Sequence, residues 1–142
     1  MGELRPVRAL SIEKMRNLWR NAQLALKDAR APAEYVSAPR RFDAAYDCAM
    51  ACALALLESS KLEVVGLGHH QDAMNFMVKT LALRGQTAQA VPVMIRARNS
   101  VRYDAMPLVN EQVVTSAIDW ADRILAETEA WLQANQPLAL KN

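Results

Sequence analysis

The sequence predicts an all-α domain, an antiparallel bundle of about five helices. Its 142 residues suffice for one hydrophobic core, which we place at about residues 11–134 of a single domain spanning residues 1–142. Hydrophobic residues make up 52% of the chain and charged residues 23%, with only 4 Gly and 6 Pro, so the composition is that of a folded domain and not of a linker. Alanine and leucine are frequent while β-branched residues are scarce, which favours helices over strands.

Two helices are expected in the first part of the chain. Ser11 can cap a helix that runs to about residue 29, with an apolar stripe along one side. A second helix begins at Ser37-Ala38-Pro39, where the proline fits the first helical turn. Every residue from Cys48 to Leu57 is apolar. A helix that is apolar all round is buried all round, so this helix should be the central element of the bundle.

A connection is expected over residues 58–70. It contains Val64-Val65, which are compatible with a short strand, but nothing else in the sequence predicts a strand that would pair with it. The third helix fits residues 71–83, and Gly85 is expected to stop it because glycine readily adopts the left-handed backbone conformation that ends many helices.

The fourth helix is expected from about residue 86 to Tyr103 and the last from about residue 110 to 134, followed by a frayed tail. The chain shows no secretory signal and no apolar run of the roughly 20 residues that a membrane span needs. Its two cysteines, Cys48 and Cys52, lie four residues apart on one expected helix, where a mutual disulfide is geometrically poor. These features predict a cytoplasmic protein that does not contact a membrane.

No metal site and no cofactor is predicted. Cys48, Cys52, His69 and His70 have side chains that zinc prefers, but cysteine sites usually use a CxxC spacing and not CxxxC on a continuous helix. We therefore expect buried thiols in an Ala-rich helix, and histidines that cap the following helix or bind a partner group.

Charged residues gather at the start of the second helix. Asp43 and Asp47 lie one turn apart, directly after Arg40 and Arg41. Paired carboxylates can serve in hydrolysis, but at a helix start they are usually solvated and loosely paired with neighbouring arginines, which is the arrangement expected here. The sequence contains no glycine-rich phosphate loop, no GxSxG elbow and no HExxH motif.

The strongest candidate site lies on the fourth helix. The apolar stripe Val91-Met94-Ile95 leads at helical spacing into Arg98, with Arg102 one turn further on. An arginine on the packed side of a helix needs an acid, a carbonyl, an aromatic face, a partner subunit or a phosphate, because a buried guanidinium without partners is costly. Arg98, Arg102 and Tyr103 are therefore candidates for binding phosphate and base.

The same arginines are equally suited to structural pairing. Asp104, Glu111 or an acid of a neighbouring subunit would each neutralise Arg98 or Arg102. Spacing alone does not distinguish the two uses.

Two segments resemble the HEPN domain, a family of small helical proteins named for nucleotide binding in higher eukaryotes and prokaryotes. One is RRFDAAYD at residues 40–47, which leads into the Ala-rich helix, and the other is RNSVRYD at residues 98–104. HEPN ribonucleases carry an arginine, a polar residue directly after it, and a histidine a few positions further on. Arg98 and Asn99 match the first two positions, whereas Tyr103, Asp104 and Ala105 occupy the positions open to the histidine.

The resemblance implies a HEPN-like helical fold and a homodimer with this motif near the interface. The family includes RNA-cleaving toxins and partners of small nucleotidyltransferases. Metal-independent RNA cleavage needs a base for the 2′-hydroxyl, and a tyrosine phenol, with an ordinary pKa of about 10, is a poor base near neutrality. We therefore expect a non-catalytic dimer that binds RNA, a nucleotide or a protein partner such as a nucleotidyltransferase-like protein. The binding residues would be Arg98, Asn99 and Tyr103.

Two alternatives remain open at this point. The first is an active metal-independent endoribonuclease of the toxin–antitoxin type, with Arg98, Asn99 and Tyr103 as its catalytic residues or with a distant His69 or His70 as its base. The second is a purely structural helical dimer whose arginines only pair with acids.

Overall fold

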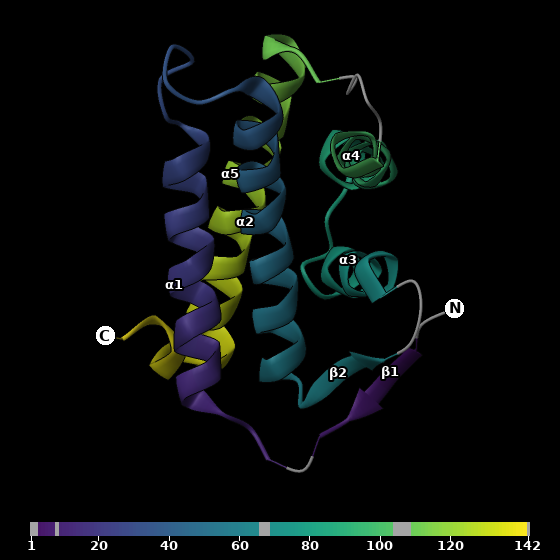
Figure 1. Cartoon of the computed structure of the whole chain (residues 1–142). Helices are drawn as coiled ribbons and strands as arrows, with labels where there is room; N and C mark the ends of the chain where they lie inside the picture. Colours follow the sequence, from purple (N-terminus) through teal and green to yellow (C-terminus); the bar gives the residue numbers. More distant parts are fainter. Residues whose placement is uncertain (1–2, 8, 66–68, 104–108, 142) are drawn as a thin grey trace.

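The fold is an all-α helical bundle, as the sequence predicts. A computed structural model describes residues 3–7, 9–65, 69–103 and 109–141. Three long helices, α1 (Ile12–Ala29), α2 (Ala38–Ser59) and α5 (Glu111–Asn135), run side by side. Two further helices, α3 (His69–Thr80) and α4 (Gly85–Tyr103), pack on α2 and are seen nearly end-on in Figure 1, so they cross the other three.

The predicted helix starts are confirmed by their caps. The Ser11 side chain accepts a hydrogen bond from the Lys14 amide at 3.1 Å, and Ser37 accepts one from Arg40 at 3.4 Å. Each cap satisfies one of the amides that a first helical turn leaves without a backbone partner.

The boundary between α3 and α4 differs from the prediction. Helix α3 ends at Thr80, and Gly85 is the first residue of α4 instead of the stop signal of α3. Gly85 has a positive φ of 59°, which glycine adopts without steric cost, and so the chain turns sharply there into the next helix.

Helix α2 is the central element, as expected, but it is not buried on all sides. Ala45, Ala49 and Ala53 are fully buried, and these small residues allow α1 and α5 to approach closely. Met50 is only half-buried, and Leu54 is exposed although it lies within the apolar run. One face of α2 therefore remains open.

The prediction that a strand near Val64 would lack a partner is wrong. Strand β2 (Leu62–Val65) pairs antiparallel with β1 (Glu3–Pro6), in a register that places Glu3 opposite Val65. An ion pair between Arg5 and Glu63 joins the two strands. The sequence of β1 is four residues long and includes a proline, so it carries too little alternation to be recognised as a strand.

The expectation of a frayed tail is also wrong. Residues Pro137–Leu140 form a 3-10 helix, η1, that packs against α1 and α5. Ala139 is buried, and the carbonyl of Leu138 accepts a hydrogen bond from the Arg16 Nε at 2.8 Å. The described part of the chain contains no helix that is long and apolar enough to cross a membrane.

Candidate functional site

Arg98 lies against the ring of Tyr46. Val91 and Met94 on α4 are buried, and Arg98 follows them on the same stripe as a half-buried residue. Its guanidinium carbon is 5.1 Å from the centroid of the Tyr46 ring, which is the geometry of a cation–π contact. Among the partners that such an arginine requires, the structure therefore provides an aromatic face. Its Nε atom is buried and has no hydrogen-bond partner among the described residues.

Tyr46 is the centre of an aromatic cluster that joins four helices. Its hydroxyl is 3.3 Å from the Nδ1 of His70, and the two rings stack at 6.0 Å with an interplanar angle of 17°. Phe42 and Trp120 each lie 6.4 Å from the Tyr46 ring, centroid to centroid. Tyr46 lies on α2, His70 on α3, Arg98 on α4 and Trp120 on α5, so this ring lies where α3 and α4 meet α2 and α5.

Burial raises the pKa of the Tyr46 phenol from 10.0 to about 12. The positive charge of Arg98 opposes the shift and the negative charge of Asp47 adds to it. Tyr46 therefore stays protonated at any physiological pH and acts as a hydrogen-bonding and stacking group, not as a base.

This shift predicts a loss of stability at alkaline pH. Between pH 10 and 12 the unfolded chain releases the Tyr46 proton while the native protein retains it, so this contribution is present in full below pH 10 and is lost as the pH rises toward 12. The loss reaches about 1.4 kcal/mol by about pH 11. We expect urea denaturation from about pH 9 to pH 11 to show Tyr46→Phe gaining this amount relative to the wild type. A difference that does not change with pH would contradict the burial of the phenol.

The carboxylates of α2 face the arginines of α4. Arg102 Nη2 lies 3.6 Å from Asp43 Oδ2, while the other carboxylate oxygen of Asp43 is buried with no hydrogen-bond partner in the described structure. Lost hydration and the nearby Asp43 raise the pKa of the Asp47 carboxyl, and Arg98 and Arg102 lower it. Asp47 is exposed, as expected of a solvated carboxylate, whereas Asp43 is half-buried and pairs with Arg102 of α4 instead of with Arg40 or Arg41.

Arg41 was expected to be solvated and loosely paired with the acids of the same helix, and the structure differs. Its side chain is buried, donates to the Val36 carbonyl at 2.9 Å and pairs with Glu111. Glu111 was one of the acids considered as a partner for Arg98 or Arg102, and the structure assigns it to Arg41. The other, Asp104, lies outside the described residues.

The remaining motif residues occupy a different side of α4. Asn99 is exposed, and the Tyr103 side chain is 83% exposed. Arg98 thus turns toward α2, whereas Asn99 and Tyr103 face solvent, and Arg102 lies between these two environments. The structure brings Arg98 and Arg102 together with Tyr46 and Asp43, and it does not bring Tyr103 onto Arg98.

Tyr46 and His70 were not among the site residues expected from the sequence. Tyr46 lies in the segment that carries the HEPN resemblance, but its spacing indicated only a helical face. His70 was interpreted as a cap or partner-binding residue, and nothing in its spacing indicates that it meets α2. The side chain of its neighbour His69 lies outside the described part of the structure.

Both cysteines are buried free thiols. Burial, followed by the neighbouring Cys48 thiol, raises the pKa of the Cys52 thiol well above its ordinary value. A protonated thiol is a poor metal ligand. Among the described residues no group of three or more His, Cys, Asp or Glu side chains is placed to hold a metal ion.

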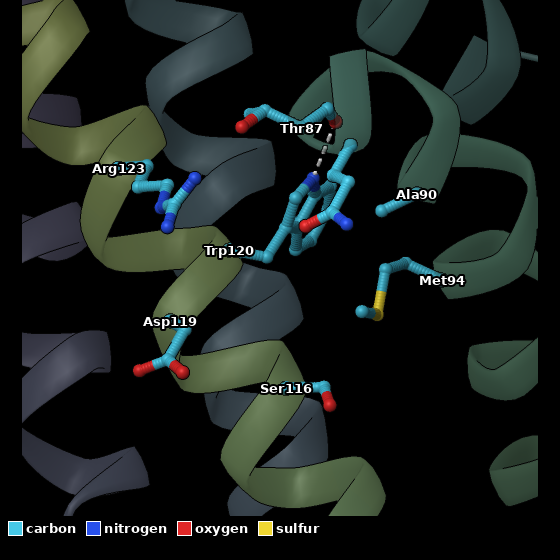
Figure 2. Close-up of a pocket in the computed structure, with 8 residues that line it drawn as sticks. Thr87, Ala90, Met94, Ser116, Asp119, Trp120 and Arg123 are labelled. Carbon is cyan, nitrogen blue, oxygen red and sulfur yellow. Dashed lines mark hydrogen bonds between the residues drawn. The ribbon is translucent and has the colours of Figure 1, made fainter.

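A hollow of about 220 Å³ lies between α4 and α5 (Figure 2). The Trp120 indole nitrogen donates a hydrogen bond to the Thr87 carbonyl at 3.1 Å, shown as a dashed line in Figure 2, and this bond ties the start of α4 to α5. Arg84 lines a separate hollow with Arg123 and Thr87. The residues around the hollow in Figure 2 are Gln86, Thr87, Ala90, Met94, Ser116, Asp119, Trp120 and Arg123.

Comparison with known proteins adds no identification. No protein-family model matches the chain, and no curated protein is significantly similar to it in sequence.

Proposed function

We propose that this protein is a HEPN-like RNA-binding domain that holds single-stranded RNA on the outer face of α4 without cleaving it. The observation that carries the proposal is Tyr103, an aromatic side chain that is 83% exposed at the end of a helix with three arginines. Aromatic rings exposed beside guanidinium groups are the usual means by which proteins bind single strands, because each base stacks on a ring while arginines contact the phosphates.

The charge of α4 supports the same function. Its 19 residues include Arg96, Arg98 and Arg102 and no acid. Arg96, Asn99, Arg102 and Tyr103 are all exposed, and they follow one another along the outward side of the helix. Contacts from arginines to phosphate release counterions and favour binding at low salt.

The acids beneath α4 do not block this surface. Asp43 offsets the charge of Arg102, but their 3.6 Å contact joins two partly exposed side chains, and such pairs contribute little to stability. A phosphate can therefore exchange with Asp43 as the partner of Arg102, while Arg96 carries its charge on the exposed side of the helix.

A second candidate function is metal-independent RNA cleavage, and His70 is the observation that favours it. His70 and Arg98 both contact Tyr46, so an imidazole and a guanidinium lie in one cluster. In that reaction His70 would take the 2′-hydroxyl proton and Arg98 would stabilise the charge that develops on the phosphate.

Fluorescence anisotropy with a labelled single-stranded RNA of about 12 nucleotides tests the proposal. We expect the affinity to fall as salt rises from about 50 to 200 mM, with a logarithmic slope near −1.4 if Arg96 and Arg102 contact phosphates. Tyr103→Ala should weaken binding by about 1–3 kcal/mol, the loss of one stacked base. Arg96→Gln should reduce the slope by about 0.7.

Matched controls are present in the chain. Tyr35, 79% exposed in the turn between α1 and α2, provides Tyr35→Ala, and Arg20 on α1 provides Arg20→Gln. Equal effects of Tyr35→Ala and Tyr103→Ala, or an affinity that does not depend on salt, would show that α4 is not the RNA site. Cleavage of the RNA in the presence of a chelator, abolished by His70→Gln, would favour the second candidate. Light scattering of the same samples tests the homodimer that the HEPN resemblance implies.

A further inference from the structure

The open face of α2 forms a furrow with α1. One hollow of about 440 Å³ and another of about 240 Å³ lie along this helix pair, and they adjoin each other at Leu18 and Leu54, which line both. The second hollow extends to β2. We call this surface the α1–α2 furrow and define it by its apolar residues, Leu18, Leu24, Met50, Leu54, Leu62 and Val64.

The furrow exposes apolar side chains, and one of them, Leu54, is predicted to be buried by the sequence pattern. Leu24 on α1 is 51% exposed and Leu54 on α2 is 37% exposed. Leu54 belongs to the run from Cys48 to Leu57 in which every residue is apolar, yet the described part of the chain leaves it partly exposed. Grouped apolar side chains rimmed by polar ones are typical of a surface that binds a partner.

The furrow is acidic on a molecule whose net charge is +2. Glu58 is paired with Lys14 at 3.3 Å, and Glu63 is paired with Arg5. Asp28 and Asp47 form no ion pair within 4 Å in the described part of the chain. The titratable residues that line the furrow are four acids and one base, namely Asp28, Asp47, Glu58, Glu63 and Lys14. Asp28 and Asp47 are exposed and form none of these ion pairs, so a cationic partner can pair with them, and they repel RNA.

The dimensions fit one helix. Helix α2 rises about 16 Å between Asp47 and Glu58, which is about three helical turns. We infer that the α1–α2 furrow binds an amphipathic helix of another protein. Its apolar residues, at i, i+3 or i+4 and i+7, cover Leu24 and Leu54, and Lys or Arg side chains at one end pair with Asp28 and Asp47.

A second copy of this chain is a poor occupant. Helix α4 is basic, but the large hydrophobic side chains that it exposes are Val93 and Tyr103, and these do not make an apolar stripe three turns long. A helix of a separate protein that carries both leucines and lysines would supply the apolar stripe and the positive charges together.

The probe is a synthetic amphipathic peptide with leucines on one face and lysines at one end, and the matched peptide has glutamate in place of each lysine. Anisotropy with the full chain should show the lysine peptide binding at least about tenfold more tightly than the glutamate peptide. Leu54→Lys should weaken binding by about tenfold or more, as expected from losing one buried leucine. Asp28→Asn should weaken it by a few-fold at low salt and not at high salt.

Leu138→Lys is the matched control, because Leu138 is an exposed leucine on η1, away from the furrow. It should leave peptide binding unchanged, and Leu54→Lys should leave RNA binding unchanged, which separates this surface from the RNA site. The inference is overturned if neither peptide binds, if both bind equally, or if Leu138→Lys acts like Leu54→Lys. Self-association that Leu54→Lys abolishes would assign the furrow to a second copy and overturn the partner inferred here.

Discussion

Replacing Tyr46 with alanine is expected to lower the free energy of unfolding by about 3–5 kcal/mol, the range for removing a large aromatic side chain from a core. The Tyr46 side chain is only 1% exposed. Its ring contacts Phe42, His70, Trp120 and Arg98, so the substitution leaves a cavity and also removes the aromatic face beneath the Arg98 guanidinium. Urea denaturation followed by far-UV circular dichroism measures the loss.

Tyr46→Phe separates the ring from the hydroxyl. It retains the packing and the cation–π contact with Arg98 and removes only the polar contact with His70, so near neutral pH we expect a cost of about 0.5–1.5 kcal/mol. If Tyr46→Phe cost as much as Tyr46→Ala, the hydrogen bond to His70 and not the packing of the ring would hold α3 and α4 on α2.

The parts of the fold that depend on neighbouring residues could be predicted. Ser11 and Ser37 cap the helices that follow them, because a cap requires only a side-chain oxygen and an amide three residues later. The long stripe of α5 repeats over many turns, and its helix was predicted to within one residue at each end.

The parts of the fold that depend on distant residues could not be predicted from the sequence. Strands β1 and β2 pair residues nearly sixty positions apart, and neither strand is long enough to show an alternating pattern. The 3-10 helix η1 is held by packing on α1 and by the hydrogen bond from Arg16 to Leu138, and its own sequence indicates none of this.

For the candidate site, too, the features of a single helix could be predicted, whereas the contacts between helices could not. The stripe on α4 showed that Arg98 needs a partner, but a stripe identifies a face of one helix and not the helix that packs against it. Tyr46 is 52 positions earlier in the chain, and Asp43 is a similar distance from Arg102. The open face at Leu54 was also missed, because an apolar run predicts burial whether the covering surface belongs to this chain or to another protein.

Replacing Trp120 with alanine is expected to release α4 and to weaken RNA binding without changing any residue of the proposed RNA surface. Of the 19 residues of α4 only Val91, Met94 and Ser100 are buried, so this helix has little packing of its own. Trp120 is buried, lines the hollow between α4 and α5, and bonds to the Thr87 carbonyl in the first turn of α4. The global cost should be about 3–5 kcal/mol.

Hydrogen exchange locates this effect. We expect the amides of α4 to exchange much faster in Trp120→Ala, while those buried between α1 and α2 lose protection only to the extent that global stability falls. Trp131→Ala is the control, because Trp131 is a half-buried tryptophan on the same helix, and it should leave α4 protected and RNA affinity unchanged. If the α4 amides exchanged equally in the two variants, the contact between Arg98 and Tyr46 would be sufficient to hold α4.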